Sequence, residues 1–163
     1  MQTLDIPAYR VLRLENLNDA PCSSGASPGD DPTEAEGFLE NFITDPSRHM
    51  IVIDHPHIEN ALASCASLQR YPGLKASHRA LIGGVYTTPT LRRQGFARAL
   101  LDYMIDLAKQ WAGLRYLALS VSADSAGAIA LYESLGFVQW GTEPDVIHID
   151  GRDYDEVYLT LKL

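Results

Sequence analysis

The fold of this chain is decided by residues 85–97, which read VYTTPTLRRQGFA. The stretch begins in an apolar segment typical of a strand, passes through a short basic loop and enters an amphipathic helix. The first turn of a helix has amide N–H groups without partners and the positive end of the helix dipole, so it binds anions. Gly95 lets the backbone come close to a ligand, Ala97 is small, and Arg92 and Arg93 add mobile positive charge. The stretch therefore indicates a loop that can cradle a diphosphate, although loops of this composition also occur as plain connections.

The residues after this stretch alternate between helix and strand patterns. Apolar side chains recur at helical spacing from Ala97 to Trp111, and Gly113 is a typical helix end. Residues 157–163 alternate between apolar and polar side chains, which is the pattern of a strand with one buried face. Between them we expect a strand at 116–121, a helix at 125–135 that stops at Gly136, and weaker strands at 137–141 and 146–149.

The residues before the stretch show the same alternation. We expect a first strand at 9–14, because its side chains are β-compatible, and a loop at 20–31. The pair Asp31-Pro32 predicts a helix start, and this helix ends before Pro46. Further strands are expected at 49–54, 61–68 and 80–87. Strands interleaved with helices indicate one domain of α/β (α+β) class over residues 1–163, built on a central sheet.

Composition and charge exclude several classes of function. The 163 residues carry a formal net charge of −8, and a nucleic-acid partner would need a basic face instead. An acidic chain favours a cationic substrate such as an amine, but the same charge can serve solubility alone. No apolar run is long enough to cross a membrane and the N-terminus shows no secretory signal, so we expect a cytoplasmic protein without a membrane partner. Cys22 and Cys65 match no metal-ligand spacing, so neither a metal site nor a catalytic thiol is expected.

A second informative segment, residues 125–137, reads SAGAIALYESLGF. Taken alone, it predicts a helix with core leucines in which Tyr132 is a packing residue. Together, however, the two segments resemble the GNAT superfamily of acyl-CoA-dependent N-acyltransferases. The first matches the family's coenzyme A loop, Val-x-Thr-x-Pro-x-x-Arg-x-x-Gly-x-Ala, and the second matches Ala-x-x-Leu-Tyr-x-x-x-Gly-Phe, which lies beside the coenzyme A thiol.

The resemblance implies a fold and an activity. The fold is a mixed, mainly antiparallel sheet of about seven strands flanked by helices, with a V-shaped split between the fourth and fifth strands. The activity is transfer of an acetyl group from acetyl-CoA to an amine acceptor, without a metal ion. The protein could act as a monomer or as a homodimer. The reaction needs no covalent enzyme intermediate, because the amine attacks the thioester directly.

The resemblance also implies roles for particular residues. Tyr132 is the expected general acid for the leaving thiolate, because a phenol of pKa about 10 is protonated at neutral pH. The residues expected to bind coenzyme A are Val85, Tyr86, Thr87, Arg92, Arg93, Gln94, Gly95, Phe96, Ala97, Arg98, Ser125 and Tyr132.

Two departures from the family pattern leave alternatives open. Ser125 stands where many members have Asn, so it either contacts coenzyme A or only caps its helix. Residues 80–87 contain no carboxylate, although many members have a glutamate base on that strand. Candidates for the base elsewhere are Glu143, Asp145, His148, His78 and His49. The alternative function is that of a catalytically inactive, coenzyme A-binding sensor or interaction module.

Overall fold

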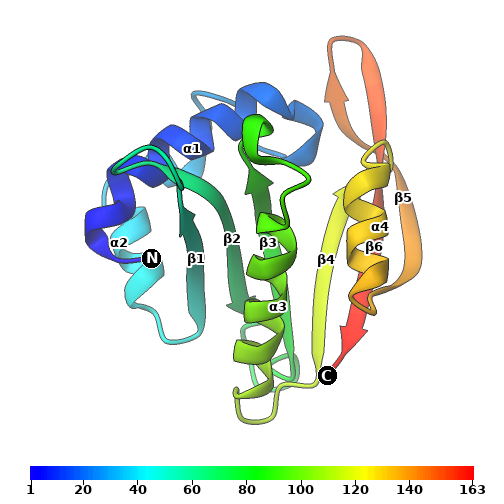
Figure 1. Ribbon diagram of the computed structural model, residues 1–163. Helices are drawn as coiled ribbons and strands as arrows, with labels where there is room; N and C mark the ends of the chain where they lie inside the picture. The colour runs from blue at the N-terminus through cyan, green and yellow to red at the C-terminus, as the bar shows by residue number, and fades with distance from the viewer.

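A six-stranded mixed sheet forms the centre of the computed structural model, which describes residues 1–163 (Figure 1). The strand order is β1-β2-β3-β4-β6-β5, and all neighbouring strands are antiparallel except β3 and β4. The predicted α+β class and the mixed, mainly antiparallel sheet are confirmed, with six strands in place of about seven. The strands are β1 (Arg48–Asp54), β2 (Leu62–Arg70), β3 (Arg79–Thr87), β4 (Tyr116–Ser122), β5 (Val138–Ile149) and β6 (Arg152–Lys162).

The predicted strand at residues 9–14 is wrong, because these residues lie inside helix α1 (Ile6–Asp19). Tyr9, Leu12 and Asn16 are buried at spacings of three and four residues, which is the period of a helix. Val11, which contributed to the strand prediction, is 70% exposed. Packing of one helical face against the sheet therefore overrides the β-compatible composition.

The two weak strands predicted at 137–141 and 146–149 are one strand, β5. Its pairing with β6 shifts register between Gln139 and Gly141 and again between Glu143 and Ile147. Such bulges let a strand continue past an irregular residue, here Pro144, without ending the ladder. This continuity, together with the helix at α1, explains the lower strand count.

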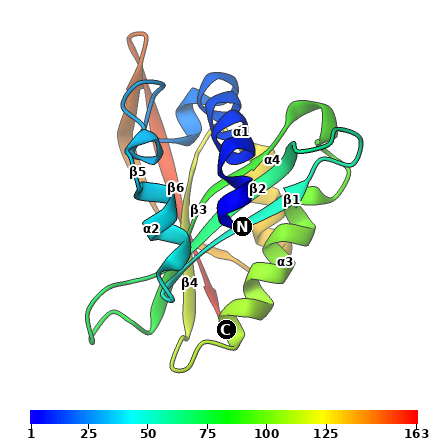
Figure 2. The same cartoon turned by 90° about the vertical axis from the view of Figure 1, so that its left-hand side faces the viewer.

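Helices cover both faces of the sheet (Figures 1 and 2). On one face, α3 (Phe96–Lys109) and α4 (Ala126–Ser134) pack in a core cluster with strands β2, β3, β4 and β6. On the other, α1 and α2 (Phe38–Thr44) form a second cluster over β1, β2 and β3. None of these helices is both long and apolar enough to traverse a bilayer. The short helices are η1 (Thr3–Asp5), η2 (Pro21–Ser23), η3 (Pro32–Glu34) and η4 (Pro89–Leu91).

The helix predicted to start at Asp31 is present in two pieces. The Asp31 carboxylate accepts a hydrogen bond from the backbone N–H of Thr33 at 3.2 Å and so caps η3, as expected. Gly37, with φ +73°, then separates η3 from α2. Helix α2 ends at Thr44, before Pro46, as predicted.

Strands β3 and β4 pair only at one end. Residues 79–81 are partners of residues 116–118, and no further pairs follow. Beyond them the two strands separate toward their C-terminal ends (Figure 1). This confirms the predicted V-shaped split, which lies between the third and fourth strands of the chain because the expected first strand is helical.

Strand β3 carries a bulge on the edge of the split. Ser67 pairs with Gly83 and Cys65 pairs with Tyr86, so β3 has one more residue than β2 over this stretch. Gly84 lies in the bulge with φ +60°, a conformation that glycine adopts without strain. The hydroxyl of Ser67 donates to the carbonyl oxygen of Gly83 at 3.1 Å and holds the irregular segment to β2.

A buried thiol is expected to weaken the fold in alkaline solution. Cys65 is 2% exposed, and burial raises the pKa of its thiol from 9.0 to about 12. Between these two values the unfolded chain releases a proton that the folded chain keeps, so the free energy of unfolding falls as pH rises. Cys65→Ala should make this fall shallower in urea denaturation from about pH 8 to about pH 11. Cys22→Ala, which removes the partly exposed thiol, is the control; equal slopes for wild type and Cys65→Ala would contradict the expectation.

Candidate active site

The loop between β3 and α3 presents a row of free amide groups. The backbone N–H groups of residues 93–98 donate no hydrogen bond within the chain, and the first helical bond runs from Ala99 N–H to Gly95 C=O at 2.9 Å. Arg93 and Gly95 have φ angles of +64° and +90°, which turn the backbone into the helix. A Cβ built on Gly95 meets no atom within 4 Å, so the space at this residue is open. Consecutive free amides at a helix start form an anion site.

Arg92 is fixed in place by the chain itself. Its Nε donates to the carbonyl oxygen of Thr87 at 3.0 Å, and its guanidinium forms an ion pair with Asp19. The guanidinium carbon also lies 5.5 Å from the centre of the Tyr86 ring, within range of a cation–π interaction. Arg92 therefore ties the loop to the end of β3 and to α1, whereas the sequence suggested a mobile charge.

Two further arginines, Arg93 in the loop and Arg98 in the first turn of α3, remain exposed. Arg93 forms no ion pair and its side chain makes no hydrogen bond, while Arg98 donates to Ser134 Oγ at 2.5 Å without a carboxylate partner. Both positive charges flank the free amide groups. They are the charges near the start of α3 that an incoming anion can engage.

Arg92→Ala is expected to destabilise the fold, because Asp19 would lose its cation and the loop its bond to Thr87. The arginine side chain is 44% exposed, so solvent screening limits the expected loss to about 1 kcal/mol. That corresponds to roughly 2–4 °C in Tm for a chain of this size. Arg93→Ala is the matched control and should leave the Tm of the free protein unchanged. Equal Tm values for the Arg92→Ala variant and wild type would show that Arg92 does not stabilise the fold.

Two carboxylates that the sequence did not single out lie beneath this loop. The Tyr86 hydroxyl donates to Glu15 at 3.1 Å and to Asp19 at 3.2 Å, and Thr88 Oγ1 donates to Glu15 at 2.5 Å. Burial, with the two neighbouring carboxylates, raises the pKa of Tyr86, which stays protonated at neutral pH. Both carboxylates belong to α1. Glu15 and Asp19 are four residues apart, which places them on the same face of a helix. The strand predicted at residues 9–14 concealed this spacing.

The coenzyme A residues predicted from the sequence fall into two groups in the structure. One group follows the end of β3 into the start of α3, and the other belongs to α4 and its cap. The first group is Val85, Tyr86, Thr87, Arg92, Arg93, Gln94, Gly95, Phe96, Ala97 and Arg98, and the second is Ser125 and Tyr132. Beyond Leu81 the edge of β3 that faces β4 has no strand partner, so its backbone groups line the split.

Tyr132 lies in α4 and is 5% exposed. Its ring packs edge-to-face against Phe137, with ring centres 6.0 Å apart, and it shares the core cluster with Ile82 of β3 and Leu100 of α3. Its hydroxyl makes no hydrogen bond within the chain, and burial raises its pKa to about 12. Tyr132 is therefore both a packing residue and a neutral phenol on the α3 side of the sheet.

Ser125 stands at the N-cap position of α4, but its hydroxyl makes no capping hydrogen bond. Its carbonyl oxygen accepts from the N–H groups of Ala128 at 2.9 Å and Ile129 at 3.0 Å. The half-buried hydroxyl therefore has no partner at the start of the helix. A contact between Ser125 and coenzyme A remains a prediction.

The five candidate bases lie in three separate parts of the fold. His49 is on β1, His78 precedes β3, and Glu143, Asp145 and His148 are on β5. His49 packs against Trp111 with ring centres 5.4 Å apart, and β2 and β3 separate it from the split. Only the three β5 residues lie on the β4 side of the split. Nowhere do three His, Cys, Asp or Glu side chains gather in an arrangement that could hold a metal ion.

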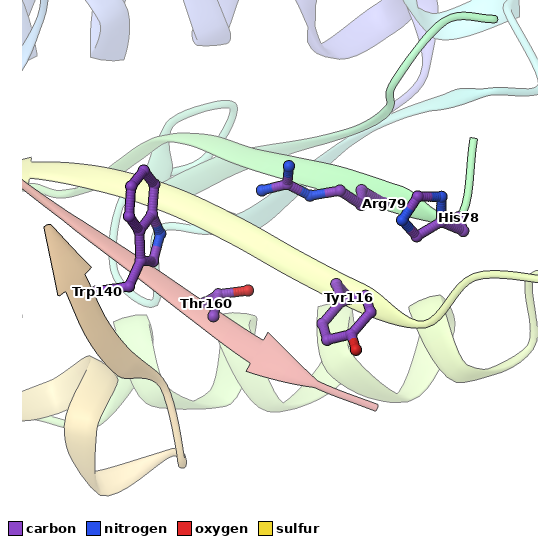
Figure 3. A pocket seen from close by; sticks show the side chains of 5 residues that line it. All are labelled: His78, Arg79, Tyr116, Trp140 and Thr160. Carbon is purple, nitrogen blue, oxygen red and sulfur yellow. The ribbon is translucent and has the colours of Figure 1, made fainter. Parts of the chain in front are cut away.

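An open pocket of about 390 Å³ spans β3, β4, β6 and β5 (Figure 3). Its lining residues are His78, Arg79, Tyr116, Trp140 and Thr160. Arg79 and Tyr116 are partners where β3 and β4 are still paired, so the pocket lies at the closed end of the split. It contains none of the residues predicted to bind coenzyme A.

The matches to known proteins include a family model, two proteins of similar sequence and one solved structure of similar fold. The model of the Acetyltransferase (GNAT) family matches residues 12–137. The [Ribosomal protein bS18]-alanine N-acetyltransferase of Escherichia coli strain K12 is 49% identical over 59 residues, which cover 36% of this chain and 38% of that relative. A Bacillus subtilis protein named "Putative phosphinothricin acetyltransferase YwnH" is 26% identical over 155 residues, 94% of each chain.

Among solved structures, a ribosomal-protein-alanine N-acetyltransferase from Brucella melitensis superimposes with a TM-score of 0.84. The superposition covers 100% of this chain and 97% of that one, at 21% sequence identity. At this identity the likeness establishes the shared fold alone.

Proposed function

Because the chain belongs to the Acetyltransferase (GNAT) family, we propose that it is an N-acetyltransferase that moves an acetyl group from acetyl-CoA to a primary amine of a small molecule or peptide. The observation that carries the proposal is the row of free amide groups at residues 93–98, beside the split between β3 and β4. Acetyl-CoA is the donor that the family uses. Its diphosphate is the anion that such amides bind, with Arg93 and Arg98 beside them.

The edge of β3 that faces the split would hold the pantetheine arm. This edge has no strand partner beyond Leu81, so its N–H and C=O groups can pair with the amides of the arm, as an added strand would. A backbone N–H at the end of β3 that faces the split, such as that of Thr87 next to Tyr86, is the candidate donor to the oxyanion. A donor of this kind contributes about 100- to 1000-fold to the rate.

Tyr132 would supply the proton for the leaving group. The amine nitrogen attacks the carbonyl carbon, the C–S bond breaks, and the phenol proton moves to the sulfur. The proton that the amine nitrogen gives up passes through water to the phenolate, so the phenol is restored and the enzyme itself is never acetylated. The phenol carries that proton at neutral pH, and burial, which raises its pKa to about 12, favours the protonated form further.

The proposal is tested by the release of coenzyme A thiol from acetyl-CoA in the presence of single amines. The panel contains a diamine, a peptide with a free alanyl N-terminus and an α-amino acid. We expect thiol release that depends on the amine and equals the amount of N-acetylated product.

A second candidate, a coenzyme A-binding module without catalysis, is favoured by the lack of a carboxylate in residues 80–87. It predicts stabilisation by coenzyme A, about 2.7 kcal/mol at a hundred times the dissociation constant, with no thiol release for any amine. Both functions would be refuted if coenzyme A does not stabilise the protein and no thiol is released from acetyl-CoA.

A further inference from the structure

Three polar residues lie in one row across β4, β6 and β5. Ser122 on β4 is the Cα partner of Glu156 on β6, and Glu156 is the partner of Glu143 on β5. Partners on antiparallel neighbours direct their side chains to the same face of a sheet. That face is opposite to α3 and α4, because the adjacent residues Val121 and Val157 pack with the α3–α4 cluster.

Two features of this row are unfavourable in the chain alone. Glu143 and Glu156 place like charges directly opposite each other on neighbouring strands, which destabilises a sheet. Ser122 is 1% exposed and its Oγ has no hydrogen-bond partner, although buried hydroxyl groups nearly always have one. A ligand that carries positive charge and N–H donors would correct both defects, because it offsets the carboxylates and donates to the hydroxyl oxygen.

The surroundings of the row favour the same kind of ligand. Residues 138–163 contain six acidic and two basic side chains. The Tyr158 hydroxyl donates to Glu143 at 2.6 Å, and the Tyr158 ring centre lies 5.5 Å from that of Trp140, which is 62% exposed. Aromatic faces beside carboxylates attract an ammonium group. The pKa of Tyr158 is raised to about 12 by its hydrogen bond to Glu143, by burial and by the charges of Glu143 and Glu156. Both carboxylates therefore act on this phenol.

We infer that Glu143, Glu156 and Ser122 form the ammonium-binding part of the acceptor site, and that the acceptor is a cationic amine such as a diamine. The inference rests on the proposed acetyl transfer. The row lies at the C-terminal end of β4, where the split is open, on the face opposite to the helix that starts at the donor loop. Helix η2 lies against β4 and β5 and contributes to the wall of this region.

This charge arrangement also excludes one class of acceptor. An amine with its own carboxylate or phosphinate brings a second anion close to two glutamates, so α-amino acids and phosphinothricin should bind poorly. The chain would then differ in its acceptor from the activity named for the Bacillus subtilis relative. It would favour amines whose other charges, if any, are positive.

The test measures the binding of 1,4-diaminobutane to the full chain saturated with coenzyme A. Binding is measured by calorimetric titration and by thermal denaturation. The double variant Glu143→Gln/Glu156→Gln keeps the size and hydrogen-bonding capacity of both side chains. We expect it to bind the diamine about ten- to a hundredfold more weakly, while its affinity for coenzyme A is unchanged. Its own Tm should rise, because the like-charge pair is gone.

Ser122→Ala provides a second readout. Loss of a buried hydroxyl without a partner should raise the Tm of the free protein and weaken diamine binding. Asp150→Asn, in the exposed turn of the same hairpin, removes one charge far from the row and is the control. Wild-type affinity of the double variant for the diamine, equal weakening in the control, or phosphinothricin that binds as tightly as the diamine would each overturn the inference. Binding is measured without turnover, so the outcome does not depend on whether thiol release is observed.

Discussion

Gly95→Asp is expected to weaken coenzyme A binding by about a hundredfold. Gly95 lies in the middle of the free amide groups of residues 93–98, and the space at its Cβ is open, so the new carboxylate would face the proposed diphosphate. Two like charges about 4 Å apart repel by about 4 kcal/mol near a protein surface. Salt and solvent reduce that value, and about 2.7 kcal/mol corresponds to the hundredfold change. The dissociation constant is measured by calorimetric titration with coenzyme A.

Two controls separate charge from backbone strain in this experiment. Gly95→Asn has nearly the same shape as Gly95→Asp and tolerates the positive φ equally well, but it carries no charge, so it should bind much better. Gly29 has φ +94°, like Gly95 at +90°, and also has no atom within 4 Å of its ideal Cβ. Gly29→Asp therefore imposes the same strain outside residues 93–98 and should bind coenzyme A normally. Equal affinity for Gly95→Asp and Gly95→Asn would mean that no diphosphate lies there.

Tyr132→Phe is expected to lower kcat by a hundredfold or more, because general acid catalysis contributes about 10²- to 10⁴-fold. The ring of Tyr132 stays in its edge-to-face contact with Phe137, so the fold should persist. The KM values for acetyl-CoA and amine should change little, because the lost interaction is made in the transition state. The measurement is steady-state thiol release over a range of both substrates.

Tyr103→Phe is the matched control for this substitution. Tyr103 is 58% exposed on α3, so removal of its hydroxyl should leave kcat unchanged. A Tyr132→Phe enzyme with wild-type kcat would show that another group, or water, protonates the thiolate. A rise in KM alone would instead assign Tyr132 to substrate binding.

The donor side of the site could be predicted from the sequence because its parts are local. A strand, a loop with Gly95 and an amphipathic helix follow one another within residues 85–109, and the structure keeps them in that order. The free amides then follow from the geometry of any helix start. The helix around Tyr132 was predictable for the same reason, since its apolar residues and Gly136 mark its course and end.

Other features depend on contacts between distant segments and could not be read in this way. Residues 9–14 have strand-like side chains, and only packing against β2 and β3 selects the helix. Arg92 looked mobile because its partner Asp19 lies 73 residues away. Ser122 and Glu143 become partners of Glu156 only through strand register, and the bulges in β5 set the register of Glu143.

The most direct test of acetyl transfer is a single turnover followed by mass spectrometry. The protein is mixed with an equal amount of acetyl-CoA, first alone and then with 1,4-diaminobutane, and the masses of protein and amine are recorded. We expect the protein mass to stay unchanged in both mixtures, with N-acetylated amine and free coenzyme A formed in equal amounts only when the amine is present. An acetylated protein without amine, or intact acetyl-CoA in the presence of every amine tried, would contradict direct transfer by this chain.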